Sequence, residues 1–110
     1  MANTTVINLR IHSREMLDAM ADDRFVSIDR NTKWGNPFLI GKDGTRQVVV
    51  EKYKKRIKKN ATLLSRLPQL KGKVLGCWCV EKPIDYIRDN KRCHGEVLLE
   101  LLFNMEVEKL

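Results

Sequence analysis

Short apolar runs that are typical of strands occur at three places along the chain. Residues 6–9 form the first run, and residues 25–29 partly alternate apolar with polar positions, as a half-buried strand does. Residues 74–80 are almost continuously apolar, which fits a strand that is buried on both faces. The pattern therefore predicts a short, mostly buried sheet.

Apolar residues at helical spacing separate these runs. We expect a short helix that Ser13 caps and that extends to residue 20, a helix after the turn at 42–45, a short helix that stops before Pro68, and a core helix from Glu96. The second helix carries Val49, Tyr53 and Ile57 at intervals of four, which is the spacing of one buried stripe. The polar segment 81–92 is expected to form a loop or an irregular helix.

Strands and helices thus mix along a chain of 110 residues. This length suits one hydrophobic core, so we expect a single small α/β domain over 1–110, with its sheet packed against helices. Apolar residues make up 43% of the chain, which is enough for such a core. No run approaches the roughly 18 apolar residues of a membrane span, and the N-terminus lacks a signal-peptide pattern. We therefore expect a cytoplasmic protein that does not enter a membrane.

The charge of the chain points to anionic partners. The formal net charge is +7, from 21 basic against 14 acidic residues, which suits nucleic acid or a phosphorylated small molecule. Basic residues are dense over 52–59 and could form a nucleic-acid-binding face. They point in several helical directions, however, and no aromatic residues interleave to stack bases, so a solvated helix surface is the favoured interpretation.

The cysteines and one histidine form the main candidate site. Three cysteines are an odd number, which favours reduced thiols over a disulfide framework. If the strand end and the following helix start meet, the thiols of Cys77 and Cys79 face Cys93 and His94. These four residues have the ligand types of a structural zinc site, although Cys-x-Cys is a tight spacing.

Thiolate chemistry is the second interpretation of this cluster. Cys93 lies just before the expected core helix, where the helix dipole and the free N–H groups favour negative charge. It would be the nucleophile, with His94 or Glu96 as a proton-transfer partner. The third interpretation is purely structural, because free cysteines are among the most buried residues.

The loop 34–38, Trp-Gly-Asn-Pro-Phe, is a second candidate site. Trp34 offers a stacking face, Gly35 lets a backbone approach a ligand closely, and Asn36 offers donors and an acceptor. A nucleotide bound there would place its phosphate on Arg30, Lys33 or Arg46. The alternative is a hydrophobic plug that closes the sheet.

Several of these motifs together resemble the domain-of-unknown-function family 4326, a family of small proteins from bacteria, phages and other viruses. The resemblance covers about residues 25–103 and rests on Trp-Gly-Asn-Pro-Phe at 34–38, Gly-Thr-Arg at 44–46, Tyr53, Leu-Lys-Gly-Lys at 70–73, Leu-Gly-Cys-Trp-Cys at 75–79 and Cys-His-Gly-Glu at 93–96. The 80–92 segment is longer than in most members. The resemblance implies that the motifs share one pocket, but it implies no activity.

Three functional hypotheses follow. The first is a zinc- or thiol-dependent pocket, formed by the residues named above, that handles a nucleotide-like or other phosphorylated ligand. The second is a non-enzymatic basic module that binds nucleic acid. The third is a viral protein that interacts with a host protein, which is suggested only by analogy with the family.

Overall fold

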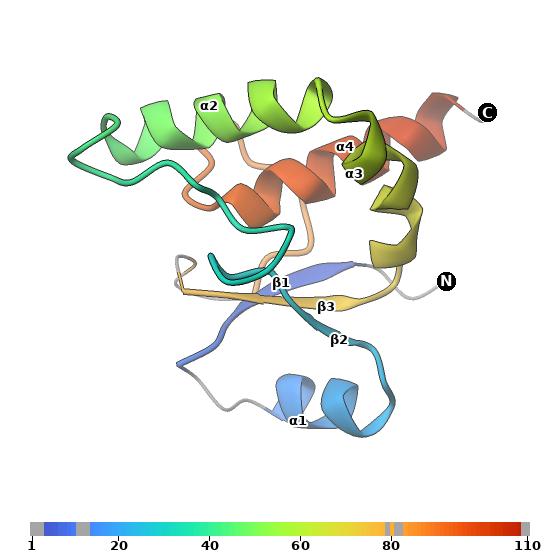
Figure 1. Cartoon of the computed structure of the whole chain (residues 1–110). Helices are drawn as coiled ribbons and strands as arrows, with labels where there is room; N and C mark the ends of the chain where they lie inside the picture. The colour runs from blue at the N-terminus through green and yellow to red at the C-terminus, as the bar shows by residue number, and fades with distance from the viewer. Residues whose placement is uncertain (1–3, 11–13, 79, 81–82, 109–110) are drawn as a thin grey trace.

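The structure, a computed structural model, describes residues 4–10, 14–78, 80 and 83–108. The elements follow one another in the order β1 (Thr5–Asn8), α1 (Arg14–Ala21), β2 (Phe25–Ser27), α2 (Arg46–Lys58), α3 (Ala61–Arg66), the 3-10 turn η1 (Leu67–Leu70), β3 (Val74–Cys77) and α4 (His94–Glu108) (Figure 1). This is the α/β domain that the apolar pattern predicts.

The sheet has three parallel strands in the order β1-β3-β2. Thr5 of β1 and Phe25 of β2 both align with Val74 of β3, so the three strands start at the same level and point in the same direction. All four residues of β3 are buried, as expected for the central strand of a covered parallel sheet. The carboxyl ends of all three strands therefore meet at one edge.

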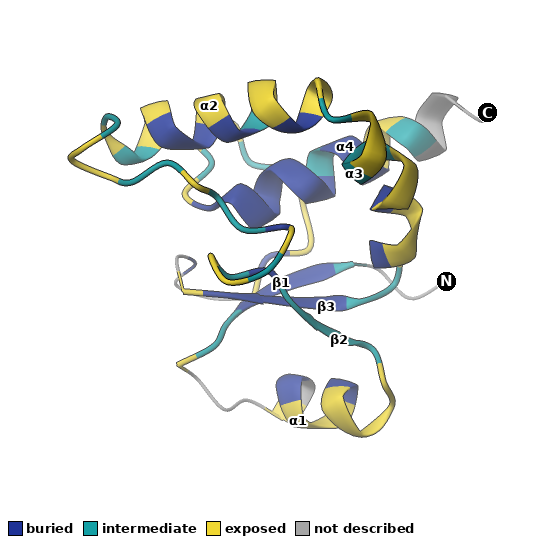
Figure 2. Cartoon of the chain, in the orientation of Figure 1, coloured by how far each residue is buried: buried dark blue, intermediate teal, exposed yellow. Residues whose placement is uncertain are grey.

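Helices cover both faces of the sheet unequally. Helix α1 packs on one face, where Ile7, Met16, Ala19 and Val74 form a small cluster. Helices α2, α3 and α4 lie on the other side of the sheet, and the buried sides of α2 and α4 face inward (Figure 2), so the main core lies there. None of the helices in the described ranges combines the length and apolar character that a bilayer span requires.

The boundaries of two predicted elements differ from the structure. The strand predicted over 74–80 ends at Cys77, because the chain leaves the sheet there and exposes Trp78. The last helix begins at His94 instead of Glu96, since the Glu96 carboxylate accepts the N–H of Cys93 and so caps the helix start. The proposed cap Ser13 lies outside the described residues.

The other helix predictions are confirmed. Thr45 caps α2 by accepting the N–H of Val48, and Asn60 caps α3 by accepting the N–H of Leu63. Helix α3 ends at Arg66, and the chain then continues through Pro68 as the 3-10 turn η1.

The described part of the long segment after β3 forms a loop. Its Ile84 is fully buried and makes an antiparallel bridge with Val6, with two backbone hydrogen bonds of 2.8 Å. The side chain of Asn8 donates to the carbonyl of Val80 at 2.9 Å. The loop thereby covers the outer edge of β1, which would otherwise offer unpaired backbone groups.

Candidate functional site

A pocket of about 460 Å³ opens at the carboxyl edge of the sheet. Its lining comes from the loop after β2, the start of α2, the residue after β3 and the start of α4. The polar and aromatic members of this lining are Asp29, Arg30, Asn31, Asn36, Phe38, Arg46, Trp78, Arg92, Cys93 and His94. Ligands of parallel α/β domains bind at this edge, where loops and helix N-termini converge.

Cys93 lies directly before the first turn of α4. Its Sγ accepts the backbone N–H of Gly95 at 3.3 Å, while the Cys93 carbonyl accepts the N–H of Glu96 at 3.0 Å. The residue is only 1% exposed and lines the pocket. A backbone N–H and the positive end of the helix dipole thus face this sulfur, and both favour a thiolate over a thiol.

His94 is held in one tautomer by its contacts. Its Nε2 lies 2.5 Å from the carbonyl oxygen of Ile28, which only accepts hydrogen bonds, so Nε2 carries the proton. In the neutral ring, Nδ1 therefore keeps its lone pair. Nδ1 lies 3.8 Å from Cys93 Sγ, within the range of a hydrogen bond to sulfur. The imidazole is placed to accept the proton of the Cys93 thiol.

Tyr53 supports this pair from α2. Its ring meets the His94 ring edge-on, with centroids 5.1 Å apart, and its hydroxyl donates to the Trp34 carbonyl at 2.8 Å. Burial, and then the negative charge of Cys93, raise the pKa of Tyr53 far above its ordinary value of 10.0. Tyr53 therefore stays protonated and acts as a hydrogen-bond donor, not as a base.

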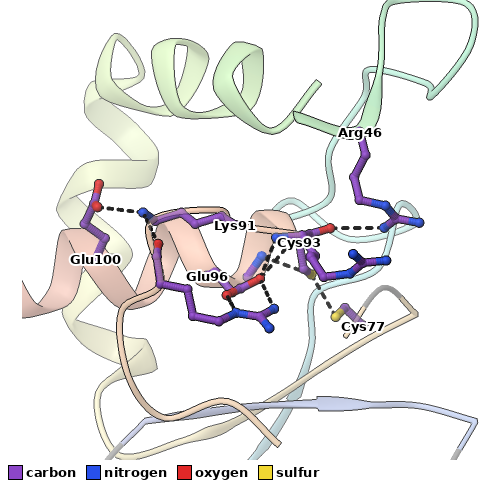
Figure 3. Close-up of polar contacts among 9 residues, drawn as sticks. Arg46, Cys77, Lys91, Cys93, Glu96 and Glu100 are labelled. Carbon is purple, nitrogen blue, oxygen red and sulfur yellow. Dashed lines mark hydrogen bonds and ion pairs between the residues drawn. The ribbon is translucent and has the colours of Figure 1, made fainter. Parts of the chain in front are cut away.

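Cys77 at the end of β3 contacts Cys93 directly. The two Sγ atoms lie 2.9 Å apart across 16 residues of sequence, and both side chains are buried (Figure 3). The expected meeting of strand end and helix start is thus observed for these two thiols. Cys79 lies outside the described residues, and the described residues contain no group of three metal-ligating side chains. The zinc site therefore stays a prediction.

Glu96 lies behind the pocket and does not line it. Its side chain is fully buried and accepts two hydrogen bonds from Arg88, Nε to Oε1 at 2.6 Å and Nη2 to Oε2 at 2.8 Å. Oε2 also accepts the backbone N–H groups of Arg92 and Cys93 at 2.8 and 3.1 Å (Figure 3). These contacts hold the backbone of Arg92 and Cys93 in place, and a proton-transfer role of Glu96 stays a prediction.

The three predicted ligand residues of the 34–38 loop have mainly structural contacts. Trp34 is 3% exposed and is not part of the pocket lining. A side chain at Gly35 would lie 2.4 Å from the carbonyl oxygen of Asp29, so the close backbone approach is to the protein itself. Asn36 lines the pocket, but its amide bridges the Val49 carbonyl and the Phe38 N–H.

Arg46 lies in the pocket as expected, together with residues that the sequence motifs did not single out. Its Nη1 donates to the carbonyl of Arg92 at 3.1 Å, which joins the start of α2 to the loop before α4. Trp78 directly follows Cys77, the last residue of β3. Because β3 ends one residue earlier, Trp78 lines the same pocket as Cys93, with a 52% exposed side chain.

The basic residues of 52–59 surround α2 and do not form a single face. Lys54 points to α4 and pairs with Glu100 at 2.6 Å, and Lys52 donates to the Asp43 carbonyl at 2.7 Å. Lys55 and Lys58 are exposed elsewhere on the helix. This distribution agrees with the solvated helix surface that the sequence favours.

Fold and site together define a small parallel α/β domain with a buried cysteine–histidine pair in the lining of a pocket that also contains three arginines. The family model described as "Domain of unknown function (DUF4326)" matches residues 11–104, and the chain belongs to this family. The match confirms the resemblance seen in the sequence motifs and extends it in the N-terminal direction.

Two curated relatives are of viral origin. An uncharacterised protein of Acanthamoeba polyphaga mimivirus is 42% identical over 71 residues, which are 64% of this chain and 53% of the relative. An uncharacterised 12.4 kDa protein from the nrdA-td intergenic region of Enterobacteria phage T4 is 37% identical over 82 residues, which are 70% of this chain and 66% of the relative. The chain thus spans about half of the first relative and just under two thirds of the second. No solved structure matches the chain significantly.

Proposed function

We propose that the pocket binds a phosphorylated, nucleotide-like ligand and that the Cys93 thiolate acts on this ligand as a nucleophile. The observation that carries the proposal is the contact between Cys93 Sγ and His94 Nδ1, at a helix N-terminus that opens into a pocket with three arginines. Each of these features favours a negative charge at the same place.

The lining supports an anionic ligand with an aromatic part. Arg30, Arg46 and Arg92 contribute three guanidinium groups, against the single carboxylate of Asp29. Guanidinium groups match the oxygen geometry of phosphate, and a volume of about 460 Å³ lies in the range of small-molecule sites. The exposed ring of Trp78 and the ring of Phe38 offer faces on which a base can stack.

The Cys93–His94 contact supports nucleophilic chemistry. The thiol proton moves to Nδ1 of His94, which leaves a thiolate beside an imidazolium. The imidazolium keeps its Nε2–H bond to the Ile28 carbonyl, and the Gly95 N–H stabilises the sulfur. The sulfur then forms a bond to an electrophilic carbon or phosphorus atom of the ligand. The leaving group departs with the bonding electron pair and takes the proton back from Nδ1.

Thiol alkylation tests both parts of the proposal. Folded protein is treated with iodoacetamide near neutral pH, and peptide mass spectrometry follows the modification of each cysteine. We expect Cys93 to react fastest, a slower reaction in His94→Gln, and protection of Cys93 by a nucleoside monophosphate. Arg46→Gln should weaken the protection, whereas Lys58→Gln, which removes an exposed cation outside the pocket lining, should not.

Two outcomes would overturn the proposal. One is a Cys93 alkylation rate that neither the nucleotide nor His94→Gln changes. The other is about one zinc ion per chain, found by elemental mass spectrometry of untagged protein purified without chelator, with the thiols blocked. That result would assign Cys77 and Cys93 a ligand role and would support the zinc prediction instead.

A further inference from the structure

We infer that a second hollow, which adjoins the pocket, binds the phosphate backbone of a single-stranded nucleic acid. One nucleotide of that strand would occupy the pocket as its phosphorylated ligand. Binding in the pocket rests on the proposed function, whereas binding in the second hollow does not depend on it. The hollow is called the basic groove and is defined by Arg30, Lys33, Arg56, Thr62 and Arg66.

The basic groove has a volume of about 760 Å³ and lies between the 30–37 loop, α2 and α3. Of the described residues that line it, four are cations and none is Asp or Glu. Such a one-sided charge distribution attracts an extended polyanion, since each neutralised phosphate releases condensed counterions.

The groove and the pocket meet at Arg30. This residue follows β2 and lines both hollows, so the two hollows are neighbours at Arg30. A strand that lies along the groove therefore leads past Arg30 into the pocket that holds Cys93 and Trp78. Successive phosphates and bases of one strand would meet cations in the groove and aromatic faces in the pocket.

The cations of the groove are available to a ligand. Among the described residues, no ion pair or hydrogen bond joins the side chain of Arg30, Arg56 or Arg66 to a carboxylate. The contrast with the other side of α2 is clear, where Glu100 binds both Lys54 and Lys91 at 2.6 and 2.8 Å. The groove therefore carries positive charge that no described carboxylate neutralises.

The shape favours a single strand over a duplex. The pocket is a concave site at one end of the groove, and a base enters it only when that base is unpaired and unstacked from its neighbours. A duplex keeps its bases paired inside the helix and would present only phosphates. We therefore expect single strands to bind more tightly than duplexes of the same sequence.

Helix α2 offers a matched control for the charge of the groove. Successive residues of a helix are about 100° apart, so Lys55 and Lys58 point well away from the side on which Tyr53, Arg56 and Ile57 line the groove. Both lysines are exposed. Lys55→Gln with Lys58→Gln removes the same net charge as Arg56→Gln with Arg66→Gln, but outside the groove.

Fluorescence anisotropy with a labelled oligothymidylate of about 12 nucleotides tests the inference, since single-strand sites span roughly 4–16 nucleotides. The groove variant is Arg56→Gln with Arg66→Gln, and the control variant is Lys55→Gln with Lys58→Gln. We expect the groove variant to bind about tenfold or more weakly at low salt. The slope of its log affinity against log salt should decrease in magnitude by about 1.4, which is about 0.7 for each of the two lost phosphate contacts. The control variant should lose much less. Thermal unfolding checks that both variants fold.

The remaining outcomes separate this inference from the proposed function. If a mononucleotide protects Cys93 but the oligonucleotide binds no better than the mononucleotide, the groove is refuted and the pocket proposal stands. Equal losses in the groove and control variants would also refute the groove, because they indicate a nonspecific charge effect. If the oligonucleotide binds through Arg56 and Arg66 without affecting Cys93 alkylation, the groove binds the strand but no nucleotide enters the pocket, which refutes that part of the inference. The pocket proposal also fails if the mononucleotide gives no protection either.

Discussion

The buried carboxylate of Glu96 gives the sharpest test of how the site is held. In Glu96→Gln, one carboxylate oxygen becomes an NH₂ group, which donates hydrogen bonds and cannot accept them. Four donors currently converge on this carboxylate, two from the Arg88 guanidinium and two from the backbone N–H groups of Arg92 and Cys93. The substitution therefore removes the charge and places a donor against other donors.

The expected loss of stability follows from these contacts. Removing one partner of a buried ion pair costs about 3–5 kcal/mol, because the other charge stays uncompensated. The Arg88 side chain is 18% exposed and regains some hydration, so the lower end of about 3 kcal/mol applies. For a domain of this size, this lowers the melting temperature by roughly 12 °C.

Chemical and thermal denaturation, followed by circular dichroism, measure the effect. Glu100→Gln is the matched control, one helical turn later on α4, because its carboxylate accepts from two lysines but lies in a more exposed position. We expect about 1 kcal/mol or less there. Equal losses in the two variants would refute the reasoning, since they would show that the complete burial of the Glu96 carboxylate adds nothing to the cost of removing its charge.

Two further predictions concern pH and oxidation. Hydrogen bonds from Lys54 and Lys91 lower the pKa of Glu100 below its ordinary value of 4.5, so its contribution to stability is present above that pH and is lost as the pH falls through the lowered pKa. The stability difference between the wild type and Glu100→Gln should therefore shrink on acidification from neutral pH to below the lowered pKa, and a constant difference in urea denaturation would contradict this. Diamide should convert the two thiols of Cys77 and Cys93 into a disulfide while it is reduced to the hydrazine, because their sulfurs are in contact. Peptide mapping should find this disulfide, and Cys77→Ser should prevent it; a different cysteine pairing would count against the described geometry.

The helices and strands were largely predictable, because the buried side of each element appears in the sequence as apolar residues at a regular spacing. The apolar run at 74–77 marks the central strand, and the spacing of Val49, Tyr53 and Ile57 marks the buried side of α2. Boundaries were less predictable. The end of β3 and the start of α4 depend on where the chain leaves the sheet and on the cap that Glu96 supplies, and neither is a property of local propensity.

The sequence motifs indicated several of the residues that line the pocket, but only part of their arrangement in space. The motifs pointed correctly to Asn36, Arg46, Cys93 and His94 as residues of one pocket. Trp34 packs into the core, as the alternative of a hydrophobic plug has it, while Trp78 faces the pocket. The sequence contains no signal for this difference, since both are single aromatic residues beside glycine or cysteine.

The α/β class, a strand buried on both faces and the family could all be inferred from the local pattern of residues and the motifs. The tertiary structure alone decided that Cys77 and Cys93 touch, that His94 turns Nδ1 toward the thiol, and that Glu96 faces inward. It also decided that Arg30 joins the pocket to the basic groove. The physical reason is that periodicity records only whether a residue is buried. Which groups meet depends on contacts between segments that are distant in the chain.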